Sequence, residues 1–467
     1  MKKILSLLLV LTMVLSLCAC AGSDANEGGE SKVEGLSVGY SKVNITPEFS
    51  VGLGGYSDAE TRKSEGFVDY IYATCIAATD GDETILMYTI DTCAMAHSTA
   101  EKIRGLVTAA TGVPGEKIFV GATHCHSCPS LTTAADGVQY TELLMDAVVK
   151  AAQDALADRS AAAIEVATPV IEGMNFVRHY KLEDGSYAGS NFGDFSRAPA
   201  VEHATETDPQ MVLLKFDRAE DKKDVLLVNW QGHPDSASSI GYKTIAASWI
   251  GPLRDKLEEL SGMEVAYFTG ASGNQNISSQ IQEEKHFLEW RQYGEKMGEI
   301  ANEALAQLKP IEGSGINTNR VTFAAEIDHS WDPMLEQANE VYDLWKSQGK
   351  AAGDALGKTY NFTSSYQARA IKSRAKLGLT QDLELNTFNI GPIGFTTGTY
   401  EMFSDAGLYV KRNSPFEVTV IITGNSGYIP SEAAYDYRSY EADTGMYAKG
   451  TAEKLAEKYV EMLNALK

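Results

Sequence analysis

Short apolar runs that alternate with helical segments constrain the fold of this chain more than any other feature of its sequence. The apolar runs are rich in β-branched residues, whereas most longer segments between them carry apolar residues at i, i+3 or i+4, and i+7. The first pattern is typical of buried strands and the second of amphipathic helices. Their alternation predicts an α/β fold with a mixed sheet core and flanking helices.

The apolar runs give the expected strands, and the amphipathic segments give the expected helices. We predict strands over residues 37–43, 71–77, 84–90, 117–122, 162–167, 211–216, 224–230, 265–268, 316–325, 383–390, 394–397 and 417–423. We predict helices over residues 98–111, 140–157, 249–260, 287–308, 333–347 and 451–467.

The domain organisation follows from the absence of a second linker-like segment. No clear linker follows residue 33, so residues 34–467 are predicted to form a single large catalytic domain. Residues 332–376 are polar and helix-prone. We expect them to form either a helical insertion that covers a pocket or a lateral helical hairpin.

The N-terminal residues indicate export. Two lysines precede a short apolar stretch that ends in Leu17-Cys18-Ala19-Cys20. This order resembles a bacterial lipoprotein signal, in which the last cysteine carries the lipid; an ordinary secretory signal cleaved nearby is the alternative. We predict a signal peptide over residues 1–19, lipid attachment at Cys20 and a flexible polar tether over residues 20–33. The mature protein would then lie outside the cytoplasm, anchored to the bacterial cell membrane.

Net charge excludes one class of partner. The formal net charge is −23 at pH 7. Such an acidic surface repels nucleic acid and anionic lipid head groups, so we expect no DNA or RNA partner. Beyond the N-terminal stretch, no segment is apolar enough to be expected to span a bilayer.

Four expected strands are each followed at once by a polar loop with a possible metal ligand. The loops carry His124 with His126, His233, Glu401 and Tyr428. In open α/β sheets, sites gather beyond the carboxyl ends of strands, so four such ends can converge on one point. His124 and His126 project to the same side of an extended chain. One could bind a metal while the other serves as acid or base, although a single histidine at a strand end is structural more often than not.

The cysteines leave several readings open. Cys75, Cys93, Cys125 and Cys128 lie outside the signal region. The compartment permits disulfides, but no pairing can be assigned from the spacing. The C-x-x-C spacing of Cys125 and Cys128 is compatible with a redox pair or a zinc pair. No second pair with zinc-ribbon spacing follows.

A set of motifs in a fixed order supports a family resemblance. The chain opens with Val38-Gly-Tyr-Ser-Lys-Val-Asn-Ile-Thr-Pro47 and continues with Ala122-Thr-His-Cys-His-Ser-Cys-Pro129. The other motifs are Gly54-Gly55-Tyr56, Asp208-Pro209, Asn229-Trp-x-x-His233 and Gly427-Tyr428-Ile-Pro430, with Tyr435, Tyr437, Tyr440 and Glu441 behind the last. Together they resemble the neutral/alkaline ceramidase family in its N-terminal catalytic domain, over nearly the whole mature chain.

The resemblance implies a zinc-dependent amidohydrolase that cleaves an N-acyl amide. The expected substrate is ceramide, which is hydrolysed to sphingosine and a fatty acid. The family holds its zinc with two histidines, one glutamate and one tyrosine. Carried over by motif, these become His124, His233, Glu401 and Tyr428. Zinc in such a site lowers the pKa of bound water and polarises the amide carbonyl.

The resemblance also implies roles for residues around the metal. His126 would be the proton shuttle. Arg178 would hold the carbonyl oxygen, and Tyr437 and Tyr440 could donate to the oxyanion. Asn276 would line the substrate pocket at a position where the family has a serine.

Departures from the family pattern keep the substrate open. Besides Asn276, Cys125 and Cys128 replace a threonine and a glycine of the family signature, and we expect no β-sandwich domain after the final helix. One alternative is the same zinc site hydrolysing a non-lipid amide, lactam or ester. Another is a solute-binding lipoprotein without enzymatic activity, and a third is a redox protein that uses Cys125 and Cys128.

Overall fold

The computed structural model describes residues 35–467, except 57–58, 60, 132–133, 220, 285–287 and 425. The predicted signal peptide, the tether and the proposed lipid site Cys20 lie outside the described residues. Glu34–Lys467 form one compact unit. Within the described part of this unit, no helix combines the length and the hydrophobicity needed to cross a membrane.

The larger of the two main sheets has nine strands. These are β1 (Leu36–Asn44), β3 (Tyr72–Asp80), β4 (Glu83–Ile90), β5 (Ile118–Ala122), β6 (Ser160–Ala167), β11 (Val212–Arg218), β12 (Val225–Trp230), β14 (Glu264–Thr269) and β16 (Lys309–Pro310). Their order is β14-β12-β11-β6-β1-β3-β4-β5, with β16 beside β6. The pairs β4–β5 and β12–β14 are parallel and the others are antiparallel, so the sheet is mixed.

The second main sheet has four strands and packs on the first. Its strands are β17 (Ile316–Glu326), β18 (Thr380–Ile390), β19 (Ile393–Gly398) and β21 (Val418–Thr423), in that order. One apolar cluster contains inward-facing residues from both sheets. At its centre the ring of Phe388 stacks on Phe119 at 4.1 Å and on Phe395 at 4.5 Å. The core therefore lies between two sheets.

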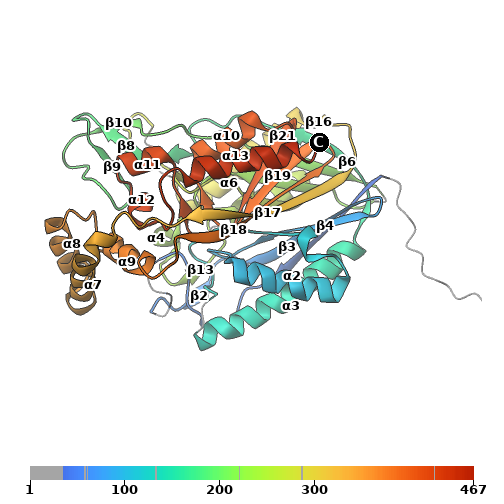
Figure 1. Ribbon diagram of the computed structural model, residues 1–467. Helices are drawn as coiled ribbons and strands as arrows, with labels where there is room; N and C mark the ends of the chain where they lie inside the picture. The colour runs from blue at the N-terminus through green and yellow to red at the C-terminus, as the bar shows by residue number, and fades with distance from the viewer. Residues whose placement is uncertain are drawn as a thin grey trace, which may run out of the picture. The chain divides into compact units, whose positions relative to one another are not determined.

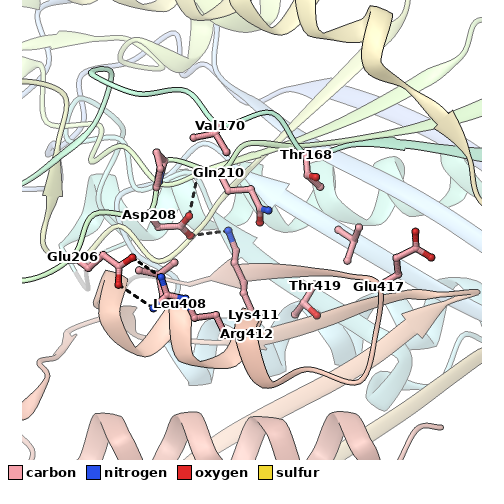
Figure 2. Close-up of a pocket in the computed structure, with 12 residues that line it drawn as sticks. Thr168, Val170, Glu206, Asp208, Gln210, Leu408, Lys411, Arg412, Glu417 and Thr419 are labelled. Atoms are coloured by element: carbon pink, nitrogen blue, oxygen red, sulfur yellow. Dashed lines mark hydrogen bonds and ion pairs between the residues drawn. The ribbon is translucent and has the colours of Figure 1, made fainter.

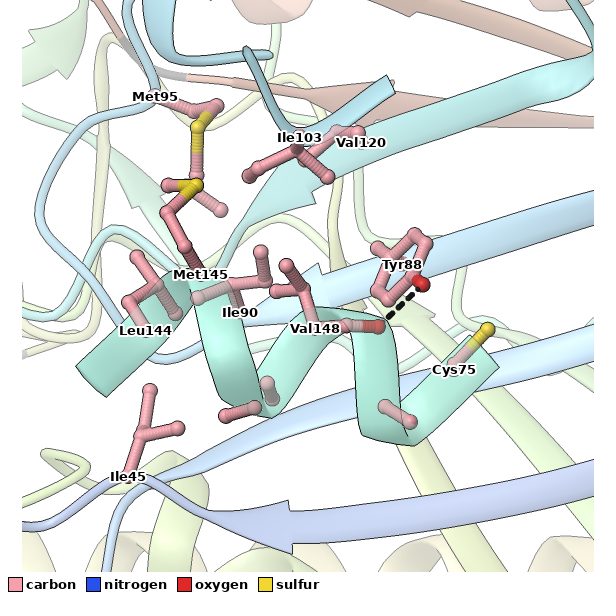
Figure 3. Packing of buried hydrophobic residues seen from close by; sticks show 14 of the residues in the cluster. Ile45, Cys75, Tyr88, Ile90, Met95, Ile103, Val120, Leu144, Met145 and Val148 are labelled. Atoms are coloured by element: carbon pink, nitrogen blue, oxygen red, sulfur yellow. Dashed lines mark hydrogen bonds between the residues drawn. The ribbon is translucent and has the colours of Figure 1, made fainter. Parts of the chain in front are cut away.

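Helices cover the outer faces of both sheets, as Figure 1 shows. On the nine-stranded sheet these are α2 (His97–Thr111), α3 (Ala135–Ala157), α5 (Ile250–Ser261) and α6 (Trp290–Ala304). On the four-stranded sheet they are α10 (Ser404–Asn413) and α13 (Thr451–Asn464). Figure 3 shows one contact in detail: the hydroxyl of Tyr88 in β4 donates to the carbonyl of Val148 in α3 at 2.7 Å.

Short elements and one helical group complete the fold. Residues 332–376 contain a 3-10 turn and three helices, α7 (Leu335–Gln348), α8 (Lys350–Thr359) and α9 (Ser365–Arg374). The short strands are β2 (Gly66–Phe67), β7 (Phe176–Val177), β8 (His179–Leu182), β9 (Tyr187–Gly189), β10 (Ala200–His203), β13 (Thr244–Ile245), β15 (Gln275–Asn276), β20 (Glu401–Met402) and β22 (Tyr428–Ile429). The short helices are α4 (Ala237–Ile240), α11 (Glu432–Asp436) and α12 (Tyr440–Thr444).

The predicted α/β fold with a mixed sheet core and flanking helices is confirmed. Every predicted strand is present, with ends displaced by at most a few residues. The predicted helix over residues 140–157 begins earlier, at Ala135, and the helix expected from residue 287 begins at Trp290. The two-residue strands were not predicted, because a period-2 pattern cannot be recognised over two residues.

Hydrogen bonds tie the carboxyl ends of four strands together. Thr423, at the end of β21, donates from Oγ1 to the carbonyl of Thr269 in β14 at 3.2 Å. Thr269 in turn donates to the carbonyl of Thr123, just beyond β5, at 2.9 Å. The buried amide of Asn229 in β12 donates to backbone carbonyls of β14 and β21 at 2.9 and 2.8 Å. The loops that follow these strands therefore start from one place.

Candidate metal centre

His124 follows β5 in a backbone conformation that ordinary residues seldom adopt. Its φ of 65° lies in the left-handed region, and such strain is concentrated at functional sites. Its Nδ1 donates to the carbonyl oxygen of Cys93 at 2.5 Å, since that oxygen can only accept. Its Nε2 lies 3.3 Å from Glu401 Oε2. Burial lowers the pKa of His124, but the Glu401 carboxylate outweighs it and raises that pKa well above its usual range. The position therefore attracts a proton or another cation.

His233 is buried just beyond β12 and has an unused ring nitrogen. Its Nδ1 lies 3.1 Å from the carbonyl oxygen of Ser272 and donates to it. Its Nε2 has no hydrogen-bond partner among the described residues. Burial lowers the pKa of His233 well below its usual range, and the charge of Arg178 adds to the effect. The ring is therefore neutral, and its unpaired nitrogen costs about 1–3 kcal/mol unless a ligand occupies it.

Glu401 and Tyr428 face each other across a small parallel pair of strands. They are Cα partners in the pairing of β20 with β22. Apart from its ion pair with His124, Glu401 Oε2 has no hydrogen-bond partner in the described part of the chain. Burial raises the pKa of Tyr428 well above 10 and Glu401 adds to this, whereas Arg178 opposes it. A nearby cation would favour the phenolate instead.

These groups fit a metal ion. Ligand atoms of His124, His233 and Glu401 all lie within 4.8 Å of one another, and all three residues are buried. Two imidazole nitrogens and a carboxylate oxygen are a donor set typical of catalytic zinc. Buried polar atoms normally have partners, so the unpaired Nε2 of His233, beside the His124–Glu401 ion pair, is what a site shaped for an ion would show. Tyr428 adjoins this group through its pairing with Glu401.

His126 lies beside the predicted ligands. Its Nε2 is 3.2 Å from His124 Nε2, and its Nδ1 is 3.6 Å from the exposed carboxylate of Asp235. Burial lowers the pKa of His126 to about 3, although Asp235 opposes the shift. The ring is therefore neutral near pH 7 and can accept a proton. Gly55 packs against it so closely that a Cβ at Gly55 would lie 2.5 Å from His126 Cγ.

Arg178, Tyr437 and Tyr440 lie near Tyr428 or are linked to it through neighbouring side chains. Arg178 is buried between β7 and β8, and its Nη2 donates to the Tyr428 hydroxyl at 3.3 Å. Nε and Nη2 of Arg178 also donate to Glu441 Oε1 at 2.9 and 2.6 Å. The ring of Tyr440 lies 6.4 Å from that of Tyr428. The Tyr437 hydroxyl is 2.8 Å from His179 Nδ1.

Asn276 lies next to this group on the backbone. It pairs with Phe176 in the two-stranded sheet of β15 and β7, and the carbonyl of the nearby Asn274 accepts a hydrogen bond from the Arg178 amide at 2.8 Å. Its side chain is half-buried. The structure thus places all predicted site residues that it describes around two adjoining loop clusters.

Cys125 and Cys128 form a disulfide that closes the loop around His126. Both cysteines are fully buried. In this oxidised form neither offers a thiolate, so the zinc-pair interpretation does not hold. Cys75 and Cys93 form no disulfide; Cys75 is buried and Cys93 is half-buried. The Sγ of Cys93 lies 4.0 Å from His124 Nδ1.

Sequence reasoning gave no role to three residues that contact the predicted site: His179, Glu441 and Asp235. His179 and Glu441 pair with Tyr437 and Arg178, respectively. Asp235 lies beside His126 and accepts a hydrogen bond from the Tyr56 hydroxyl. Their positions in the sequence could have indicated a role, because each lies close to a predicted site residue. His179 and Glu441 directly follow Arg178 and Tyr440, respectively, and Asp235 comes two residues after His233.

A surface cavity of ≈ 390 Å³ lies away from this centre, against α10 (Figure 2). Four of its charged groups are paired: Lys411 lies 2.7 Å from Asp208, and Arg412 donates to Glu206 at 2.9 Å. None of the predicted site residues is among the residues that line it.

The sequence and the fold both match known ceramidases. Residues 36–244 match the N-terminal domain of the neutral/alkaline non-lysosomal ceramidases. The resemblance predicted from the motifs is confirmed, and the match indicates a hydrolase that acts on amide bonds. His124, Arg178 and His233 lie within the matched residues, whereas Glu401 and Tyr428 lie beyond them.

Solved structures extend the similarity over most of the chain. The neutral ceramidase from Pseudomonas aeruginosa is 17% identical, with a TM-score of 0.67 and coverage of 93% of this chain and 75% of that chain. A ceramidase complexed with C2 is 16% identical, with a TM-score of 0.66 and the same coverage. These values show a shared fold. No curated protein sequence matches the chain.

Proposed function

We propose that this protein is a zinc-dependent amidohydrolase that cleaves an N-acyl amide, with ceramide as its first expected substrate. One observation carries the proposal. His233 Nε2 is buried without a hydrogen-bond partner among the described residues, and the only partner of Glu401 Oε2 there is His124 Nε2 at 3.3 Å. Ligand atoms of all three residues lie within 4.8 Å of one another. The family match supplies the reaction class in which such a centre is used.

His124, His233, Glu401 and Tyr428 would hold the zinc ion. When bound, zinc lowers the pKa of water and polarises an amide carbonyl. The neutral His126 takes a proton from the attacking water and returns it to the leaving amine. Asp235, 3.6 Å from the Nδ1 of His126, stabilises the imidazolium that forms in between.

Arg178 and the tyrosines act on the substrate oxygen. The Arg178 guanidinium carries a fixed positive charge, and its two bonds to Glu441 hold it in place. It would bind the carbonyl oxygen as negative charge develops there, together with Tyr437 and Tyr440. Because these groups are ordered before substrate arrives, little reorganisation is needed during the reaction.

A non-lipid amide, lactam or ester is the second candidate substrate class. Asn276 favours it, because a carboxamide stands where the family has a serine hydroxyl. The metal chemistry is the same in both cases, so only the part of the pocket that contacts the rest of the substrate differs.

The two adjacent histidines should separate by function. His126→Gln should retain about one zinc per chain and lose turnover by about 10²–10⁴-fold, since it removes the proton carrier alone. His233→Ala should lose the metal and the activity together. Metal analysis of both purified variants, with the exposed Tyr70→Phe as a surface control, would check this. Loss of zinc from His126→Gln would mean that His126 is a ligand.

The substrate class can be decided with a panel of amides. Ceramides with short and long acyl chains should release sphingosine, and small soluble N-acyl amides should react more slowly. Metal-depleted protein should be inactive on every member and should recover on zinc addition. Cleavage of small soluble amides alone would reject the lipid substrate and leave the zinc chemistry standing.

A lipid anchor at Cys20, as the N-terminal sequence predicts, would hold the enzyme at the membrane, where lipid amides reside. Fractionation of producing cells should find the wild-type protein with the membranes. A Cys20→Ala variant should not be acylated. Equal incorporation of labelled fatty acid into both proteins would contradict the anchor.

A further inference from the structure

A buried chain of four side chains connects two elements that are far apart in the sequence. His179 Nδ1 lies 2.8 Å from the Tyr437 hydroxyl, and His179 Nε2 lies 2.9 Å from Glu441 Oε2. The other oxygen of Glu441 accepts two hydrogen bonds from Arg178. His179 and Glu441 have no solvent exposure, and Arg178 is 6% exposed. The chain therefore runs from Tyr437 through His179 and Glu441 to Arg178.

We propose that His179 and Glu441 are positioning residues that align Tyr437 and Arg178 as one unit toward the substrate oxygen. The inference rests on the proposed function, because that function gives Tyr437 and Arg178 their contact with the substrate. It adds a dependence that the proposed function does not require: the contribution of Tyr437 to turnover needs His179.

The protonation pattern fixes the direction of each bond. Burial alone would raise the pKa of Glu441, but His179 and Arg178 outweigh it and lower that pKa to about 2. Glu441 is therefore an ionised carboxylate that can only accept, so His179 Nε2 must carry a hydrogen. A phenol carries one hydrogen, so Tyr437 can donate to the substrate oxygen only when His179 Nδ1 donates to the Tyr437 oxygen. Both ring nitrogens are thus engaged, and neither His179 nor the Tyr437 hydroxyl is free to turn.

The surrounding rings hold the same geometry. Tyr437 stacks on Tyr187 with a centroid distance of 4.8 Å. The His179 ring meets Phe192 edge-on at 5.3 Å and lies 5.6 Å from Phe403. The rings of His179 and Tyr437 are therefore each packed against further aromatic rings.

Fold stability alone does not explain such a cluster. Charged groups without solvent are costly to bury, and apolar residues of similar volume often stabilise a fold as well or better. Here one carboxylate serves two neighbouring residues, Arg178 and His179, with separate oxygens. Glu441 therefore fixes both the His179 ring and the Arg178 guanidinium. Such fixed positions are needed when Tyr437 and Arg178 must both donate to one substrate oxygen.

A double-mutant cycle on the full-length, zinc-loaded protein tests the dependence. Tyr437→Phe should lower kcat by about 100-fold, the loss typical of one oxyanion donor. His179→Leu should lower kcat by a similar factor with little change in KM and no loss of zinc. The double variant should be no slower than Tyr437→Phe alone, because the hydroxyl that His179 positions is already gone. His179→Gln, whose amide nitrogen can donate to both Glu441 and the Tyr437 oxygen, should recover part of the rate.

Tyr435→Phe serves as the matched control. Its hydroxyl donates to the Tyr447 carbonyl and makes no hydrogen bond to His179, so its effect should multiply with that of His179→Leu. If the losses of kcat in His179→Leu and Tyr437→Phe multiplied in the double variant, the proposal would be overturned. Full turnover in Tyr437→Phe would overturn it too. If His179→Leu does not fold, the same cycle is run with His179→Gln. Normal zinc content and His126-dependent turnover in these variants would show that the proposed function survives such an outcome.

Discussion

The hydrogen bonds that join the ends of β5, β12, β14 and β21 are the contacts on which the site depends. Thr423, Thr269 and Thr123 form a relay from one strand end to the next, and Asn229 bridges two of the same backbones. β5 and β14 stand at opposite ends of the nine-stranded order. Without these bonds, nothing in the strand order would bring the loop after β5 to the loop after β12. Two of the proposed metal ligands, His124 and His233, come from those loops.

The interior that these strands enclose determines the chemistry of the side chains. His124, His233 and Glu401 are each at most 5% exposed. Burial keeps His126 and His233 neutral, and it leaves ligand atoms with no water to satisfy them. A bound cation would offset these costs. The same buried groups therefore destabilise the folded protein without a metal and suit the binding of one. The left-handed backbone of His124 is a further cost to the folded state that metal binding would offset.

Much of the fold was predictable, because the long strands are continuous apolar runs and the main helices have a clear apolar stripe. The contacts that complete the site were not. Glu401 and Tyr428 are brought together by β20 and β22, each only two residues long. His179 and Glu441 are 262 positions apart, and both look like ordinary polar residues in sequence. The family resemblance gave the metal ligands, but only the structure shows which groups hold Arg178 and Tyr437.

X-ray absorption spectroscopy of the purified, zinc-loaded protein tests the central claim most directly, because it reports the atoms bound to the metal. We expect two imidazole nitrogens at about 2.0–2.1 Å from the zinc and oxygen ligands at about 2.0–2.2 Å, with no sulfur ligand. The zinc signal should be lost in His233→Ala, because that variant should not retain the metal. A sulfur ligand at about 2.3 Å would place the metal on a cysteine such as Cys93 and contradict the account. An unchanged spectrum in His233→Ala would place the metal elsewhere in the protein.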